Sequence, residues 1–207
     1  MMQPNDVVNE ALLNLGTSLF IQDISTDQSN QARIIRRMLR SSLDASLEKH
    51  PWRFAMSAQA LPLLGEYLSP DWKFSYSLPA DCLILRELGP NGSFSKVELY
   101  EQNKHRWEEV YSTGSPRIDT DVPEAWGKYT VRILETNAVP SHFGRAWAAM
   151  LAMKIAPALM GDKAGGTLQG LSGKLDEKFW MEVANDEGRA PQKLDAPNPY
   201  IQARYSC

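Results

Sequence analysis

Cysteine is scarce in this sequence: Cys82 and Cys207 are the only two in 207 residues. Two cysteines are too few for the disulfide framework on which many small secreted domains depend. Cys82 stands between Asp81 and an apolar run, which predicts a small buried side chain. A chain of this length can bury a sizeable apolar core, and its low cysteine content fits a reducing compartment.

The chain also lacks an excess of basic charge. Its 22 lysine and arginine residues are outnumbered by 25 aspartate and glutamate residues, which gives a formal net charge of -3. Dedicated nucleic-acid-binding domains usually carry a strong basic excess, so the overall charge disfavours that class. A local basic stripe remains compatible with it.

Long uncharged apolar runs are absent as well. The most apolar stretch, residues 143–160, contains Arg145, Lys154 and Pro157 and is rich in alanine. Charged side chains are costly near the centre of a bilayer, so we expect a buried core helix here and no membrane span. Residues 1–6 have neither a basic region nor an apolar core, so we expect no secretory signal.

No motif for catalysis or cofactor binding stands out. The glycine-rich segment 161–173 precedes a lysine, but Leu175 stands where a P-loop needs serine or threonine. We therefore expect this segment to be a flexible connection between two helices. None of the three histidines has a cysteine or histidine partner at metal-ligand spacing: His50, His105 and His142. We expect no catalytic residue, no cofactor and no metal.

Carboxylate pairs give the one enzymatic alternative. A glycoside hydrolase needs two carboxylates that face each other across the sugar. Four glutamates occur in close pairs in the middle of the chain: Glu98, Glu101, Glu108 and Glu109. Because a chain with 25 acidic residues contains such pairs by chance, a cell-wall glycan hydrolase is kept only as the second hypothesis.

Apolar residues recur at helical spacing near the N-terminus. Residues 6–15 form one such pattern, and Gly16 supplies its C-terminal stop. A longer helical pattern covers residues 25–49. Its start resembles a capping box formed by Ser25 and Gln28.

Strand-like alternation of apolar and polar residues dominates the middle of the chain. Glycine, proline and asparagine punctuate it. The pattern predicts strands over 72–78, 82–88, 96–99 and 128–133, with a turn over 89–92.

Helical spacing returns in the last third of the chain. Ser141 is the expected cap of an alanine-rich helix that Pro157 should kink or end. A last helix is expected over 175–185. The polar, proline-bearing segment 188–207 then has no helical or strand period, which predicts a tail that orders only on a partner. Its apolar anchors are Tyr200, Ile201 and Tyr205.

This order of elements predicts an α+β fold: an antiparallel helix bundle built from N- and C-terminal helices, with a small inserted antiparallel β region and an extended C-terminal tail. The expected parts are 1–60 for the N-terminal helices, 61–139 for the β region, 140–187 for the C-terminal helices and 188–207 for the tail.

Four arginines form the most suggestive charged cluster. Spacings of three and four residues place them along one side of the 25–49 helix. These arginines would form a channel-lining or inter-subunit basic face, or they would bind duplex DNA in a neck protein. The alternative is a solvated surface opposite the core. The four are Arg33, Arg36, Arg37 and Arg40.

Several stretches, in this order, resemble one protein family. They are Ala11-Leu12-x-x-Leu15-Gly16 with Ile24-Ser25 and Gln31-Ala32, then Pro51-Trp52-Arg53-Phe54-Ala55, then Trp72-Lys73-Phe74-Ser75-Tyr76-x-x-Pro79-x-Asp81-Cys82-Leu83, and last the alanine-rich helix 146–158. Together they cover nearly the whole chain, and they resemble the tail tubular protein A, or head-to-tail adaptor, family of short-tailed bacteriophages.

The resemblance implies a structural virion protein without catalytic residues. Such a subunit forms a homo-oligomeric ring, expected to be a dodecamer, beneath the portal protein and above the tail nozzle of the tail tubular protein B type. The ring encloses the channel through which genomic DNA passes without sequence-specific binding. Tyr200, Ile201 and Tyr205 are the expected portal or partner anchors.

Overall fold

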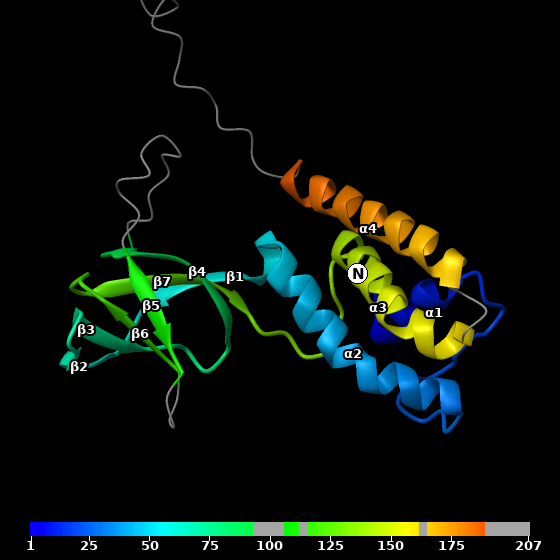
Figure 1. Cartoon of the computed structure of the whole chain (residues 1–207), viewed down its shortest axis with the longest axis horizontal. Helices are drawn as coiled ribbons and strands as arrows, with labels where there is room; N and C mark the ends of the chain where they lie inside the picture. The colour runs from blue at the N-terminus through cyan, green and yellow to red at the C-terminus, as the bar shows by residue number, and fades with distance from the viewer. Residues whose placement is uncertain (93–105, 112–115, 162–164, 189–207) are drawn as a thin grey trace, which may run out of the picture.

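A computed structural model of the chain describes residues 1–92, 106–111, 116–161 and 165–188. Within these ranges it contains four α-helices and two antiparallel sheets, so the expected mixed α+β class is confirmed (Figure 1). The helices are α1 (Pro4–Asn14), α2 (Asn30–Lys49), α3 (Ser141–Met160) and α4 (Gly165–Glu187), with a short 3-10 turn at Arg53–Ala55. The strands are β1 (Met56–Ala60), β2 (Leu63–Ser69), β3 (Trp72–Ser77), β4 (Cys82–Pro90), β5 (Trp107–Val110), β6 (Arg117–Thr120) and β7 (Ala125–Val131).

Helix α1 ends at the expected glycine. Gly16 has a φ of 69° and donates its N–H to the Leu13 carbonyl, while the Thr17 N–H reaches the Leu12 carbonyl. These two bonds satisfy carbonyls that would otherwise lack a partner at the helix end. The left-handed backbone at this position explains why the chain carries glycine there.

Helix α2 begins later than expected. The hydroxyl of Ser29 accepts the Ala32 N–H at 3.2 Å and caps the helix. Ser25 instead donates its N–H and its hydroxyl to the Asp23 carboxylate. The expected capping box of Ser25 and Gln28 is therefore wrong, because an aspartate two residues earlier holds Ser25 in a turn.

Helix α3 continues through Pro157 and ends at Met160, where Gly161 follows with a φ of 62°. The proline lies in the last turn, where the loss of one backbone hydrogen bond does not stop a helix whose preceding turns are buried. Pro140 is the N-cap residue and Ser141 is already helical, so the expected cap at Ser141 is wrong.

Helix α4 includes most of the segment expected to be a flexible connection. It begins at Gly165 and continues through Gly170 and Gly173, so the expected helix start at Leu175 is wrong. Each glycine disfavours helix by about 1 kcal/mol. The burial of α4 against the rest of the protein, led by Phe179, outweighs that preference.

The four helices share one apolar core, with α3 in the middle. Helices α1, α2 and α4 each contact α3 along its length. The first and last helices of the chain therefore bury their apolar faces in the same core. Its largest fully buried side chains are Trp52, Phe143, Trp147 and Phe179, surrounded by Leu12, Ile35, Leu43, Leu47 and Leu151.

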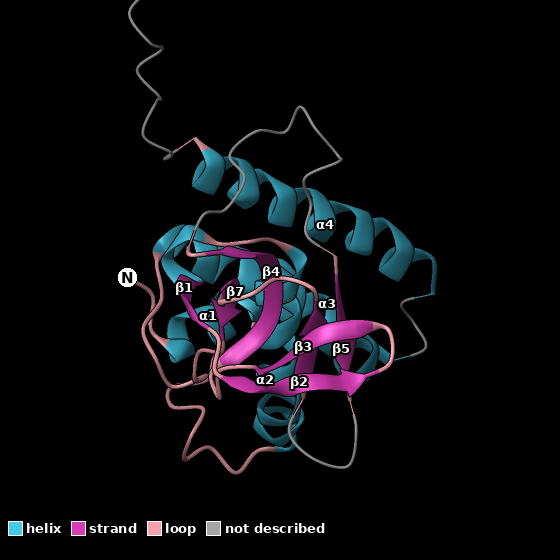
Figure 2. Ribbon diagram, turned by 90° about the vertical axis from the view of Figure 1, so that its left-hand side faces the viewer, coloured by secondary structure: helices cyan, strands magenta, loops and turns pink. Residues whose placement is uncertain are grey.

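The strands form two sheets beside the helices (Figure 2). One sheet has the order β1-β7-β4, and the other has the order β2-β3-β6-β5. Strand β1 lies before residue 61 and pairs with β7. The turn predicted over 89–92 consists only of Asn91 and Gly92, because Gly89 and Pro90 belong to β4. The strand predicted over 96–99 lies outside the described residues.

A second apolar core lies between these sheets. Tyr76, Ile118 and Tyr129 are each at most 2% exposed, and they come from β3, β6 and β7. The Tyr76 hydroxyl donates to the Val122 carbonyl at 2.9 Å, which satisfies a polar group buried in this core. The alternation that predicted β3 thus does place one face of the strand in a core.

Candidate assembly surfaces

The four arginines of α2 do not form one continuous basic surface. Arg33 and Arg37 are exposed, whereas Arg36 and Arg40 are partly buried. Arg36 donates to the Ile24 carbonyl at 2.7 Å and to the Asp27 carbonyl at 2.6 Å. It therefore holds the loop before α2 against the helix, and of the four arginines only Arg33 and Arg37 are exposed.

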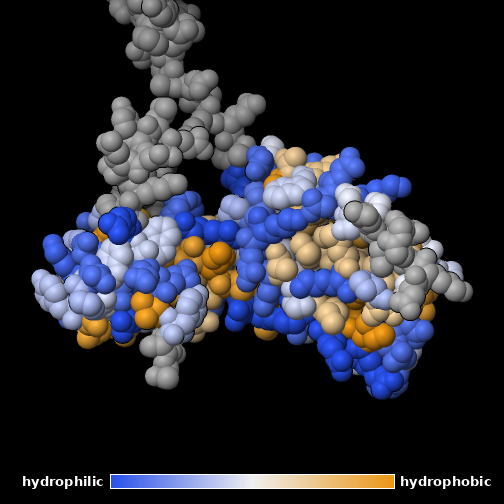
Figure 3. Space-filling view, in the orientation of Figure 1, coloured by the Kyte–Doolittle hydropathy of each residue, from blue (hydrophilic) through white to orange (hydrophobic). Residues whose placement is uncertain are grey.

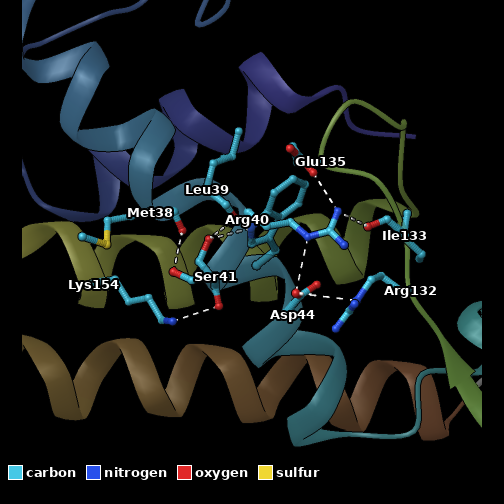
Figure 4. Close-up of polar contacts among 11 residues, drawn as sticks. Met38, Leu39, Arg40, Ser41, Asp44, Arg132, Ile133, Glu135 and Lys154 are labelled. Carbon is cyan, nitrogen blue, oxygen red and sulfur yellow. Dashed lines mark hydrogen bonds and ion pairs between the residues drawn. The ribbon is translucent and has the colours of Figure 1, made fainter. Parts of the chain in front are cut away.

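Arg40 joins α2 to the segment that connects β7 to α3 (Figure 4). Its Nη1 lies 2.8 Å from Glu135 Oε2 and 3.2 Å from the Ile133 carbonyl, just after β7. Its Nε lies 3.3 Å from Asp44, and Arg132 approaches the same carboxylate at 3.9 Å. The hydrogen bond from Arg40 lowers the pKa of Glu135 below its ordinary value.

A second arginine, Arg86, reaches from the β part to the helical part. Arg86 of β4 donates at 2.8 Å to the carbonyls of both Leu47 and Glu48, in the last turn of α2. A cation at this end satisfies free carbonyls and complements the helix dipole. Burial lowers the pKa of Arg86 from its usual value. We call the contacts of Arg40 and Arg86 across this boundary the joint; no spacing in the sequence singled out Arg86.

A buried polar cluster anchors the end of α4. The Asp186 carboxylate lies 3.0 Å from His142 Nε2 and 3.4 Å from His50 Nε2, and it accepts the Arg53 N–H at 3.3 Å. Asp186, His142 and His50 are 3%, 4% and 8% exposed, and Trp52 packs against both imidazoles. The three residues are far apart in the sequence, so their meeting depends on the tertiary fold. Asp186 thus fixes the C-terminal end of α4 against the other helices.

The two described glutamates of the hydrolase hypothesis do not converge. Glu108 accepts a hydrogen bond from Trp72 Nε1 at 3.1 Å, and Glu109 accepts one from the Tyr111 hydroxyl. Neighbouring residues of a strand point to opposite faces, so these carboxylates do not face each other. Glu98 and Glu101 lie outside the described residues.

Cys82 is a poor nucleophile in this fold. It is partly buried at the start of β4, and burial, with a smaller effect of Glu109, raises the pKa of its thiol to about 11. The thiolate is the reactive form, so at neutral pH this side chain is almost entirely unreactive thiol.

Exposed apolar side chains gather on β2, which lies at an edge of the four-stranded sheet. We call these residues the β2 edge: Leu63, Leu64, Tyr67 and Leu68, which are 53%, 54%, 71% and 52% exposed. Apolar patches are visible over both parts of the molecule in Figure 3. On the helical part the exposed apolar side chains include Leu13, Phe20, Trp180 and Met181.

The predicted tail anchors Tyr200, Ile201 and Tyr205 lie outside the described residues, so their docking role stays a prediction. Among the described residues, no group of three or more metal-binding side chains is found, and no helix there is long and apolar enough to cross a membrane.

No family model matches the chain, and no curated protein matches it.

Proposed function

We propose that the chain is a non-enzymatic head-to-tail adaptor of a short-tailed bacteriophage, which forms a ring beneath the portal. The proposal rests first on the resemblance of the sequence to that family. One of the stretches that carry the resemblance lies where the helical part leads into the strands, and another lies within the strands. Residues 51–55 lead from α2 into β1, and residues 72–83 cover β3 and the beginning of β4.

The expected antiparallel helix bundle, with the β region inserted between its halves, is part of this proposal. Its support is the common core of all four helices, in which α1 and α4 pack against α3. A strand-built part would then project from the bundle and leave two distinct ends for two distinct partners.

The observation that carries the proposal is the joint. An adaptor has to hold the portal and the nozzle at a fixed distance and angle, so its two parts cannot hinge freely. Arg86 of β4 binds two carbonyls of α2, and Arg40 of α2 binds a carbonyl and a carboxylate of the segment that follows β7. Such a contact resists the relative motion that is otherwise common between parts of a chain.

In the proposed assembly the helical part faces the portal and the β part faces the nozzle. The ring is a dodecamer built by heterologous contacts between neighbours, and it encloses the DNA channel. A subunit with a net charge of -3 suits a channel in which tight phosphate binding would hinder passage of the genome. Arg33 and Arg37 are the arginines available for a channel or inter-subunit face. The subunit would be made in the host cytoplasm and act in the virion neck.

Co-sedimentation with portal rings of the same phage tests this function. The purified chain should move from the top of a density gradient to the portal fraction, at one copy for each portal subunit. Portal rings of an unrelated phage serve as the control. Absence of the chain from the portal fraction at saturating concentration would contradict the proposal. Clearing of bacterial cell walls that is lost on Glu108→Gln or Glu109→Gln would favour the hydrolase alternative.

A further inference from the structure

Among the described strands, β2 lies at an edge of its sheet and has an unusual composition. Edge strands of soluble proteins are normally protected by charged side chains or by a covering segment. Within Leu63–Ser69 the only charged residue is Glu66, while the four apolar residues of the β2 edge are each more than half exposed.

The apolar character of β2 is not explained by the core beside it. The core between the sheets is filled from β3, β4, β6 and β7, through residues such as Tyr76, Ile118 and Tyr129. None of the residues of the β2 edge belongs to that core. The pairing of β2 with β3 is also irregular, and Tyr67 has a φ of 53°. Apolar side chains therefore stand on a distorted edge where they stabilise little within the subunit.

We propose that the β2 edge binds the C-terminal segment of a neighbouring copy, through Tyr200, Ile201 and Tyr205. The inference rests on the proposed ring and names its subunit contact. A segment of one subunit on a different surface of the next is a heterologous contact, which can repeat around a ring. An open edge offers main-chain hydrogen bonds to such a segment, and apolar side chains beside it give specificity.

The charges of the two segments are complementary. The C-terminal segment 189–207 contains Arg189, Lys193 and Arg204 against a single acidic residue, Asp195. The β2–β3 hairpin, residues 63–77, contains two carboxylates and one lysine. A third carboxylate, that of Asp121, accepts the backbone N–H of that lysine at 3.2 Å. Opposite charges of this kind steer association and set its orientation more than they add affinity.

The positions of the two segments are compatible with binding between copies. Figure 1 shows α4 along the helical part and β2 at the far end of the β part. Tyr200 follows Gly188 by 12 residues, which is a reach of at most about 40 Å in a fully extended chain. That reach is sufficient to span a contact with an adjacent subunit.

The natural Cys207 allows a direct test by disulfide trapping. One protein carries Leu63→Cys with Cys207→Ser, and the other is the otherwise unchanged chain with a different affinity tag. The two are mixed under mild oxidation, and the mixed disulfide is measured on a non-reducing gel. Cys82 interferes little because the pKa of its thiol is about 11. The matched control places the new cysteine at Leu13, which is also exposed at 68% but lies on the helical part.

The proposal predicts at least about tenfold more mixed disulfide with Leu63→Cys than with Leu13→Cys. A tenfold ratio corresponds to a preference of about 1.4 kcal/mol in binding free energy. Leu64→Cys should give the same yield as Leu63→Cys. This second position shows whether a low yield at residue 63 is caused by a local folding defect. Glu66→Lys should reduce the yield at low salt. Equal yields of the mixed disulfide at residues 63 and 13 would overturn the proposal.

This test does not involve the portal. If the chain binds portal rings but gives no preferential disulfide, the proposed function is supported and the proposed contact between copies is wrong. If the chain gives the disulfide but does not bind portal rings, the contact between copies is supported and the adaptor function is wrong.

Discussion

Arg40 Nη1 lies 2.8 Å from Glu135 Oε2, and this ion pair joins the middle of α2 to the segment between β7 and α3. The same guanidinium contacts Asp44, whose second carboxylate oxygen is buried and has no hydrogen-bond partner among the described residues. Arg40 thus both holds the segment that follows β7 against α2 and compensates the charge of a partly buried carboxylate.

Replacing Arg40 with alanine should lower the free energy of unfolding by about 1–2 kcal/mol. The side chain of Arg40 is 33% exposed, so solvent screens its charge, and the lost hydrogen bonds account for most of the effect. Arg37→Ala, on the exposed side of the same helix, should change stability by less than about 0.5 kcal/mol. Urea denaturation of both variants measures the difference. Equal effects would show that the joint does not stabilise the fold.

The stability of the protein should depend on Glu182 in acid. Arg145 holds its carboxylate through two bonds, at 2.6 and 2.8 Å. Burial raises the pKa of Glu182, but the hydrogen bonds from Arg145 and Asn185 outweigh it, and the pKa lies below the ordinary 4.5. The stabilisation is therefore present above about pH 4.5 and is lost as the pH falls through the lower folded value.

Glu182→Gln should accordingly lower the free energy of unfolding at pH 7 by about 1–3 kcal/mol. Its difference from the unchanged protein should shrink as the pH falls below the folded pKa. Glu177→Gln removes an exposed carboxylate from the same helix and serves as the control. Denaturation curves between pH 7 and pH 3 measure both. A difference that stays constant over this range would refute the role of the ion pair.

Replacement by alanine should change the stability of the protein in opposite directions at two glycines. Gly16 has a φ of 69°, so Gly16→Ala should destabilise the protein by about 1–2 kcal/mol. Gly173 lies inside α4 with nothing within 4 Å of an added Cβ. Gly173→Ala should therefore stabilise it by about 0.5–1 kcal/mol. Thermal unfolding distinguishes the two, and destabilisation by Gly173→Ala would argue against a helix at that position.

The thiol of Cys82 should be nearly inert in the folded protein. Its pKa rises from 9.0 to about 11, which lowers the fraction of reactive thiolate by about 100-fold. In a Cys207→Ser variant, reaction with Ellman's reagent at pH 8 should be slow until urea unfolds the chain. Reaction of the folded variant at the rate of a free thiol would contradict the burial of Cys82.

Local patterns predicted several elements whose apolar face lies in a core, but not β6, although Ile118 of that strand is fully buried. Strand β3 was predicted because alternation places residues such as Tyr76 in the core. Helix α2 was predicted because its apolar stripe, including Ile35 and Leu43, is fully buried. Strand β2 was missed because its apolar residues are exposed on an edge and follow no regular alternation.

Other features depend on contacts between distant residues, which spacing alone does not reveal. The glycine-rich part of α4 is helical because the rest of that helix packs on α3. The side chains of Arg36 and Arg40 resemble a surface stripe in the sequence, yet their partners are carbonyls of neighbouring segments. His50 and Asp186 meet only because the ends of α2 and α4 come together.

Electron microscopy of portal rings incubated with the chain tests the adaptor function most directly. We predict a second ring of density, coaxial with the portal and attached to one of its faces, which disappears when the chain is omitted. Portals that remain bare at saturating concentrations of correctly folded chain would contradict the central claim.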